Sequence, residues 1–352
     1  MADGSQSRAA ALTTVSSRPS GVTGGILGRV VVITGASSGI GRCTAALFAR
    51  QGWDVGLIAR GAEGLCSLQS ELAAHGTHAA AAADVADAAA LEQATAALER
   101  ELGPIDVWVN CAGNGVYGAF LDVPEDEFRR VTDVTYMGTV NGTRVALRRM
   151  VPRGRGVVVN VCSAMVFGSL PALSSYAGAK AAIRAFSDSV RHELEEARSP
   201  VRLTVIFPPA VNTPFFSHAP SYMPLPPRPA KPVYQPDIVA DAILLAATTP
   251  RREIEVSGIT VVFALASRLL PGTVRWAIGR LGAERQTTGD PEVQRLHAPT
   301  LHAPSGLSSC VYGPFGHGSR AFSTQMWLNR RRGVVAGVAA AAMGLLAVLA
   351  MQ

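Results

Sequence analysis

Short apolar runs alternate with longer helical stretches along most of this chain, and no other feature of the sequence constrains the fold as strongly. The runs are brief and rich in β-branched residues, as expected of strands, and they cover residues 30–34, 55–59, 77–84, 105–110, 156–161, 201–207 and 253–256. They are continuously apolar, which is typical of a parallel sheet covered by helices on both faces. We therefore predict an α/β fold, a doubly wound parallel sheet (Rossmann fold) that forms a single catalytic domain over residues 29–258.

The stretches between these runs are expected to be helices, and they cover residues 41–51, 87–102, 125–150, 175–198 and 236–249. Between the last two, residues 208–236 are dense in proline, which prevents regular structure. A loop of this length in a compact domain usually has a function. We expect it to act as a lid over a substrate.

The segments outside the predicted domain differ from it in composition. Residues 1–28 are rich in Ser, Ala, Gly and Thr and lack the apolar stretch of a signal peptide, which favours a disordered leader. Residues 259–282 are apolar with a few arginines, which fits both a core helix and an amphipathic helix on a membrane. Residues 283–328 are rich in Ser, Gly and Pro, which favours a linker with little structure.

The last segment, residues 329–352, begins with a basic flank and continues as an uncharged apolar run over 333–351. At 1.5 Å per residue the run spans about 28 Å, close to the thickness of a bilayer core, about 30 Å. A buried terminal helix is the alternative, but soluble domains rarely end in such a run. We therefore predict a C-terminal transmembrane helix with the lipid bilayer as its partner. The arginines at its near end predict that the catalytic domain lies on the cytoplasmic side.

The charge and cysteine content argue against two classes of function. The net charge is +6, but the basic residues are scattered and no aromatic residues interleave with them, so we expect no nucleic-acid partner. The five cysteines are isolated and odd in number, which indicates reduced thiols rather than a disulfide framework or a zinc site. We expect no metal ion.

A glycine-rich turn joins the first predicted strand to the first helix. Glycines allow a tight turn and a close approach to a pyrophosphate, which the helix N-terminus attracts. The residues placed at a cofactor in this way are Gly35, Ser37, Ser38, Gly39, Ile40 and Gly41. The same segment matches the nucleophile elbow of α/β-hydrolases, with Ser37 as the nucleophile. That alternative needs an oxyanion loop earlier in the chain, where only the leader lies.

Two arginines near this turn indicate which dinucleotide binds. An NAD enzyme carries Asp or Glu at the end of the second strand, where it binds the ribose 2′-hydroxyl. Here that position is Ala59, with Arg60 next to it, and Arg42 follows the glycine turn. Two cations without a carboxylate fit a 2′-phosphate, so we predict NADP(H). The alternative is that both arginines are exposed surface charges.

A serine, a tyrosine and a lysine carry the predicted chemistry. Tyr176 and Lys180 lie four residues apart, so a helix places them on one face. An ammonium beside a phenol lowers the phenol pKa, which lets the tyrosine act as a general acid or base near neutral pH. Ser163 follows an apolar strand, and its hydroxyl is expected to hydrogen-bond the reacting oxygen.

Together these motifs resemble the short-chain dehydrogenase/reductase family, and the resemblance covers about residues 29–258. It implies that Ser163, Tyr176 and Lys180 are the catalytic residues, and that the tyrosine and lysine also contact the cofactor. The further cofactor-binding positions that it implies are Asp84, Val85, Asn110, Ala112, Gly113, Pro208, Val211 and Thr213.

Two positions depart from the family pattern. The family's catalytic Asn, which holds a water beside the lysine, is replaced here by Thr135. The threonine hydroxyl or a backbone carbonyl is left to hold that water. Pro209 replaces the usual glycine at the start of the lid loop, which stiffens the backbone and removes an N–H.

The resemblance implies an NADP(H)-dependent oxidoreductase that transfers a hydride between nicotinamide and a carbonyl or secondary alcohol. Phe215, Phe216, Tyr222 and Met223 in the proline-rich loop favour an apolar substrate. A non-catalytic, NADP-binding sensor of the same fold is the alternative, although such proteins tend to lose the tyrosine or the lysine. The family also implies a homodimer or tetramer, assembled through the two longest helices.

Overall fold

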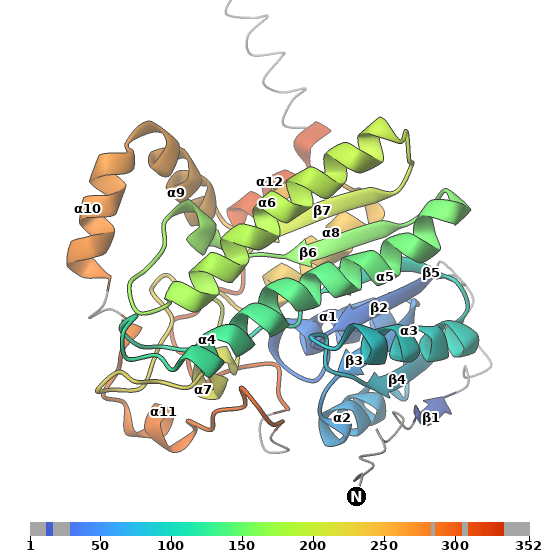
Figure 1. Cartoon of the computed structure of the whole chain (residues 1–352), viewed down its shortest axis with the longest axis horizontal. Helices are drawn as coiled ribbons and strands as arrows, with labels where there is room; N and C mark the ends of the chain where they lie inside the picture. Colours follow the sequence, from blue (N-terminus) through green and yellow to red (C-terminus); the bar gives the residue numbers. More distant parts are fainter. Residues whose placement is uncertain (1–11, 17–28, 283–285, 305–308, 334–352) are drawn as a thin grey trace, which may run out of the picture.

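The computed structural model describes residues 12–16, 29–282, 286–304 and 309–333 (Figure 1). An eight-stranded sheet in the order β1-β4-β3-β2-β5-β6-β7-β8 forms its centre. Strands β2 to β8 run parallel, and β1 pairs antiparallel with β4. The strands are β1 Leu12–Ser16, β2 Val30–Thr34, β3 Asp54–Ala59, β4 His78–Ala82, β5 Ile105–Asn110, β6 Val157–Val161, β7 Arg202–Phe207 and β8 Glu253–Glu255.

Helices cover both faces of this sheet, as the continuously apolar strands predicted. One core lies between the sheet and α1, α2 and α8, and a second between the sheet and α3, α5 and α6. Figure 1 looks onto α5 and α6, with the sheet behind them. The helices named so far are α1 Gly39–Arg50, α2 Ala62–Leu72, α3 Ala88–Leu102, α5 Gly138–Arg153, α6 Ser174–Glu196 and α8 Asp237–Thr248.

The chain reverses its direction of travel across the sheet between β2 and β5. From β2 the chain moves outward to β3 and β4, and it then returns to β5 on the other side of β2. In a doubly wound sheet, ligands bind outside the carboxyl ends of the strands at this switch point. The glycine turn after β2 and the segment after β5 therefore lie where a dinucleotide is expected.

The long helix predicted over 125–150 is interrupted. It consists of α4 Glu125–Thr132, a π-helical turn at Asp133–Met137, and α5. Such π-turns are rare and occur frequently at functional sites. Thr135, the residue that replaces the family's Asn, lies inside this turn and is buried.

The apolar segment 259–282 is neither one core helix nor one straight span. It forms α9 Gly258–Leu269 and α10 Pro271–Leu281, which meet at an angle of 118°. Pro271 at the first position of α10 explains the break. Within the described residues no single helix is long and apolar enough to cross a membrane. The predicted transmembrane run falls almost entirely on residues 334–352, outside the described residues.

Two predictions about segments outside the domain need correction. Part of the predicted leader, Leu12–Ser16, forms β1, because the edge strand β4 offers unpaired backbone groups. The predicted linker 283–328 has little regular structure beyond α11 Pro291–Arg295 and α12 Thr324–Arg330, yet its described parts pack onto the domain. The backbone N–H of Ala298 donates to the carbonyl of Ser217, and that of Arg320 to the carbonyl of Val233.

Candidate active site

The glycine turn after β2 has a shape that only glycine permits. Gly35 has φ +70°, and a Cβ there would lie 2.8 Å from the Cα of Ala112. A Cβ on Gly41 would lie 2.2 Å from the carbonyl oxygen of Gly35. The turn is thus folded tightly against itself and against the segment after β5, and α1 begins inside it at Gly39. This leaves a cradle with no side chains at a helix N-terminus, which suits a pyrophosphate.

The segment after β5 is fixed by a buried polar network. The amide nitrogen of Asn110 donates to Oδ1 of Asn160 (2.8 Å) and to the hydroxyl of Thr143 (3.1 Å), and its oxygen accepts from Trp108 (2.7 Å). Asn110 therefore lies between the sheet and α5, where it links β5 to β6 and to the helix. The hydroxyl of Thr34 accepts the backbone N–H groups of Cys111 and Ala112, which ties this segment to the glycine turn.

A cavity of about 1170 Å³ lies over the carboxyl ends of the strands and brings most of the predicted site together. Those predicted residues that line it are Gly35, Ser37, Ser38, Gly39, Ile40, Gly41, Arg60, Asp84, Val85, Ala112, Gly113, Ser163, Tyr176, Lys180, Pro208, Val211 and Thr213. Three predicted residues, Arg42, Asn110 and Thr135, do not line it.

Tyr176 and Lys180 line this cavity from α6. The lysine Nζ lies 5.6 Å from the centroid of the tyrosine ring and donates to the carbonyl of Val161 at 2.8 Å. Burial lowers the pKa of Lys180. Burial also raises the pKa of Tyr176, and a hydrogen bond with Ser163 opposes this rise only in part. We expected the lysine to lower the phenol pKa, but Lys180 is not among the groups that shift it, and burial sets the direction of the shift.

Ser163 occupies the end of β6, where a short helical turn begins. Its Oγ accepts the backbone N–H of Met165 at 3.2 Å, which caps the turn Ala164–Phe167. Its backbone is extended, which places the hydroxyl close enough to Tyr176 for a hydrogen bond between the two side chains. The serine, the tyrosine and the lysine therefore share one cavity at one edge of the sheet.

Thr135 does not line the cavity but supports it from behind. Its hydroxyl accepts the backbone N–H of Asn114 at 3.1 Å and lies 3.2 Å from the carbonyl oxygen of the same residue. Its own carbonyl accepts the hydroxyl of Thr139 at 2.8 Å. Both groups that we expected to hold a water are thus engaged with the protein, and Thr135 positions the loop that carries Asn114.

Asn114 is a site residue that sequence reasoning missed. It lines the cavity, and its amide nitrogen is buried without a hydrogen-bond partner among the described residues. Its position directly after the Asn110–Gly113 motif was the available signal. Only the π-helical turn, which aims the Thr135 hydroxyl at Asn114, shows that these two residues act together.

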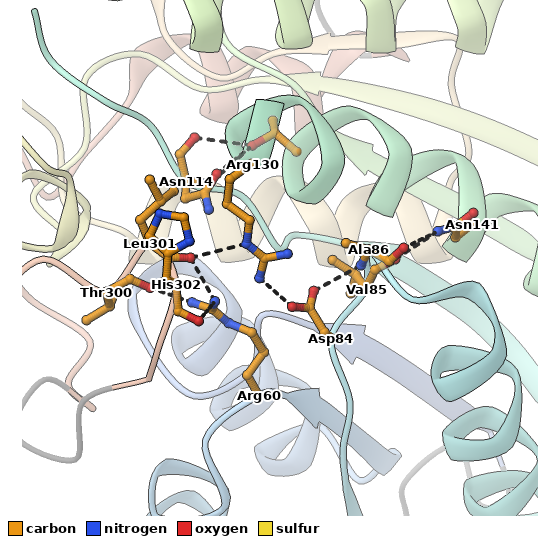
Figure 2. A network of polar contacts seen from close by, with 11 residues as sticks. Arg60, Asp84, Val85, Ala86, Asn114, Arg130, Asn141, Thr300, Leu301 and His302 are labelled. Atoms are coloured by element: carbon orange, nitrogen blue, oxygen red, sulfur yellow. Dashed lines mark hydrogen bonds and ion pairs between the residues drawn. The ribbon is translucent and has the colours of Figure 1, made fainter. Parts of the chain in front are cut away.

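Of the two arginines predicted to bind a 2′-phosphate, only one lines the cavity. Arg42 turns away from the cavity, and its guanidinium binds Glu71 (2.9 Å) and the hydroxyl of Ser67 (3.0 Å). Arg60 lines the cavity. A second cation, Arg130 of α4, lies beside it and pairs with Asp84 (Figure 2). Two arginines facing one carboxylate leave an excess of positive charge, although Arg42 is not one of them.

The same two arginines bind backbone carbonyls from the C-terminal part of the chain. Arg60 donates to the carbonyls of Leu301 (2.9 Å) and Thr300 (2.6 Å), and Arg130 donates to that of Leu301 (3.3 Å) (Figure 2). We call residues 297–304 and 309–316 the C-terminal strap. No local pattern in the sequence signals these contacts, because they join residues about 170 to 240 positions apart.

The strap closes one side of the cavity. The N–H of Thr300 donates to the carbonyl of His218, at the end of the lid helix α7 Phe215–His218, at 2.9 Å. At the other end, the N–H of Gly39 in the glycine turn donates to the carbonyl of Cys310 at 2.9 Å. Leu301 is only 2% exposed and packs with Val116 and Val131. The strap thus joins the lid to the cofactor turn.

The pattern of this site matches a known family. The family model described as short chain dehydrogenase matches residues 29–222. The chain belongs to the short-chain dehydrogenase family. It is an oxidoreductase with a Rossmann-like fold, and that fold implies a nicotinamide cofactor. Ser37 is then part of the cofactor turn, and among the described residues no histidine or carboxylate hydrogen-bonds its hydroxyl, which leaves the hydrolase alternative without support.

Individual relatives agree with this assignment. The chain is 34% identical over 284 residues to the uncharacterized oxidoreductase YxnA of Bacillus subtilis, covering 79% of each protein. It is 32% identical over 196 residues to the 3-ketodihydrosphingosine reductase of Bos taurus, which covers 54% of this chain and 58% of that enzyme. A short-chain dehydrogenase structure from Streptomyces avermitilis superposes with a TM-score of 0.60 at 28% identity, covering 72% of this chain and 97% of the other.

Proposed function

We propose that this oxidoreductase uses NADP(H) and interconverts a carbonyl and a secondary alcohol on an apolar substrate. The observation that carries the proposal is the single cavity that Ser163, Tyr176 and Lys180 share with the glycine cradle. The three side chains needed for hydride transfer and the binding place for the cofactor thus line the same cavity.

The residues present fit a nicotinamide dinucleotide. The glycine turn offers a side-chain-free cradle for the pyrophosphate, and Val85 and Ala112 form walls beside it. Thr213 lies so close to Gly39 that a Cβ added to this glycine would be 3.2 Å from that of the threonine, which closes the cradle at the nicotinamide end. When bound there, the nicotinamide supplies or accepts the hydride.

The preference for NADP(H) rests on charge at the adenosine end of the cavity. Ala59 stands where an NAD enzyme carries a carboxylate, Arg60 lines the cavity, and Arg130 lies next to it. Asp84 neutralises only one of these two charges. A dianionic 2′-phosphate complements the remaining charge and competes with the strap carbonyls for the donors of Arg60.

The proton chemistry follows from the titration of the site. A phenol is protonated at neutral pH, and burial raises the pKa of Tyr176 further, so its hydroxyl donates to a substrate oxygen and passes its proton to it during reduction. Ser163 hydrogen-bonds the same oxygen and holds the carbonyl in place. Lys180, fixed by Val161, stabilises the charge that develops on the phenol oxygen. Oxidation runs through the same groups in reverse.

The walls around these groups favour an apolar substrate. Phe215 packs on Tyr176 with ring centroids 5.2 Å apart, and Met165 and Leu173 lie beside them. Farther out, Phe263 and Ile278 extend the apolar wall. The relative named as a 3-ketodihydrosphingosine reductase supports reduction of a ketone on a lipid-like substrate.

We also propose the arrangement of the protein in the cell from its sequence. The apolar run 333–351 with its basic flank supports a single-pass C-terminal anchor with the catalytic domain on the cytoplasmic side. Assembly into a homodimer or tetramer through α4–α5 and α6 is the corresponding proposal for oligomeric state.

The test is turnover by the full chain in detergent micelles. We expect NADPH to be consumed with apolar ketones or aldehydes, and Tyr176→Phe to abolish this while leaving nucleotide binding intact. Tyr136→Phe is the matched control, because Tyr136 packs against Phe186 outside the cavity and should keep full activity. Nucleotide binding without turnover on any carbonyl would favour the sensor role instead.

A further inference from the structure

The helix pair α9–α10 presents an apolar outer surface that nothing in the described structure covers. Leu269 is 75% exposed and Trp276 is 61% exposed, and Val262, Leu265 and Leu270 are exposed as well. Scattered apolar residues are normal on a protein surface, but a contiguous group on two adjoining helices marks an interaction site. We call this group the hairpin surface.

The charge on this helix pair has a single sign. Arg268, Arg275 and Arg280 are exposed, and the sequence from 257 to 282 contains no acidic residue. Leucine and tryptophan on one side, with arginine as the only charge, are the composition of a helix that lies in the interface of an anionic bilayer. A helix built for the interior of a soluble domain would instead have its leucines buried.

Helix α12 adjoins the base of the hairpin and repeats the pattern. The hydroxyl of Ser323 donates to the carbonyl of Val256 (2.6 Å), and the amide of Asn329 donates to that of Glu255 (3.1 Å). Trp327 is 44% exposed, and the sequence from 320 to 333 again has arginines and no acidic residue. Figure 1 shows α9, α10 and α12 at the same upper edge of the molecule.

Each of the two exposed tryptophans carries an arginine over its ring. The guanidinium of Arg280 lies 5.2 Å from the ring centroid of Trp276, and that of Arg331 lies 4.7 Å from the ring centroid of Trp327. Tryptophan prefers the headgroup level of a bilayer, and arginine binds lipid phosphates. The two pairs therefore form matching anchor points on α10 and at the end of α12.

A second copy of this chain is a poor occupant for the same surface. In a two-fold interface the same patch meets itself, so the arginines of one copy would face those of the other. Like charges placed against each other weaken such an association. An anionic lipid surface instead neutralises the exposed arginines of α9 and α10.

The hairpin surface is continuous with the active-site cavity. Val262 is exposed and lines the cavity too, and Phe263 and Ile278 of the same helices form its outer wall. We propose that the edge formed by α9, α10 and α12 docks on an anionic bilayer, so that the cavity opens toward the lipid. This contact is separate from any anchor formed by residues 333–351, and it does not depend on the hydride chemistry.

The test uses the tryptophans of the full chain. Trp53 and Trp108 are buried, so in a Trp327→Phe variant Trp276 is the one exposed tryptophan among the described residues. We expect phosphatidylcholine–phosphatidylserine vesicles with acyl chains brominated near the headgroup to quench Trp276 fluorescence. The quenching should disappear when Trp276→Phe is added to the Trp327→Phe variant. Because quenching reports contact at Trp276, tethering through the tail alone does not produce it.

Charge and contact are then separated by two further measurements. Replacing Arg268, Arg275 and Arg280 together by Gln should reduce the quenching of Trp276 at least about twofold on anionic vesicles. Binding of NADPH, measured in the same variants, should stay unchanged and serves as the folding control. The proposal is overturned if Trp276 in the vesicle-bound chain is not quenched. It is also overturned if its emission depends on protein concentration alone, which would indicate a second copy.

Discussion

The C-terminal strap provides a prediction whose size can be worked out from the structure. Leu301 is 2% exposed between Val116 and Val131, and truncating a buried leucine to alanine costs about 2–5 kcal/mol. The strap keeps its backbone hydrogen bonds to Arg60 in Leu301→Ala, so we take the lower part of this range, about 2–3 kcal/mol. The strap lies outside both cores. Leu301→Ala should therefore lower the free energy of local strap opening and leave the free energy of unfolding the domain unchanged.

Amide hydrogen exchange measures the free energy of this opening directly. The N–H groups of Ala298 and Thr300 donate to the lid at 2.9 Å, and their protection should fall about 30- to 150-fold in Leu301→Ala. Leu296→Ala is the matched control, because Leu296 lies in the same segment but is 50% exposed, and its effect should be less than about threefold. Unchanged protection at both amides, or an equal loss in the central strands, would refute this account of the strap.

Three further predictions concern charge. Arg60→Ala should weaken NADPH binding about 10- to 100-fold and NADH binding far less, measured by calorimetry, because it removes donors to the 2′-phosphate; equal losses would contradict this. The pKa of His218 is lowered from 6.5 to about 4 by burial and by Arg60, so the stability linked to its neutral form is present above pH 6.5 and lost as the pH falls toward 4. This loss should reach about 1–3 kcal/mol in denaturant titrations, and His218→Gln should remove it. Because burial lowers the pKa of Lys180 below its usual 10.5 while that of Tyr176 is raised, kcat/KM should fall on the alkaline side before pH 10.5, and Lys180→Arg should move the fall to higher pH.

The sequence predicted the sheet, and it predicted that Ser163, Tyr176 and Lys180 would come together, because both depend on local patterns. The uninterrupted runs such as Val30–Thr34 and Ile105–Asn110 are strands with the predicted bounds. The spacing of Tyr176 and Lys180 sets their common face on a helix, whatever the rest of the chain does. The glycine turn is equally local, because its shape follows from Gly35 and Gly41 themselves.

Other parts of the site could not be predicted, because they depend on contacts between distant segments. Arg42 was assigned to the cofactor, but Glu71 and Ser67, on the next helix, bind it instead. The strap was interpreted as a linker because its composition is that of a loop, and composition does not show that its carbonyls meet Arg60. The pKa of the active-site phenol was misjudged for a similar reason, since burial is a property of the folded chain.

The most direct test of the central claim is a calorimetric titration of the full chain in detergent with NADPH and, in parallel, with NADH. The account predicts that both nucleotides bind in the cavity and that NADPH binds at least about tenfold more tightly, because Arg60 lines the cavity and Asp84 neutralises only one charge of the Arg60–Arg130 pair. Equal affinities would contradict the assignment of NADP(H). Failure of either nucleotide to bind would contradict the proposed oxidoreductase itself.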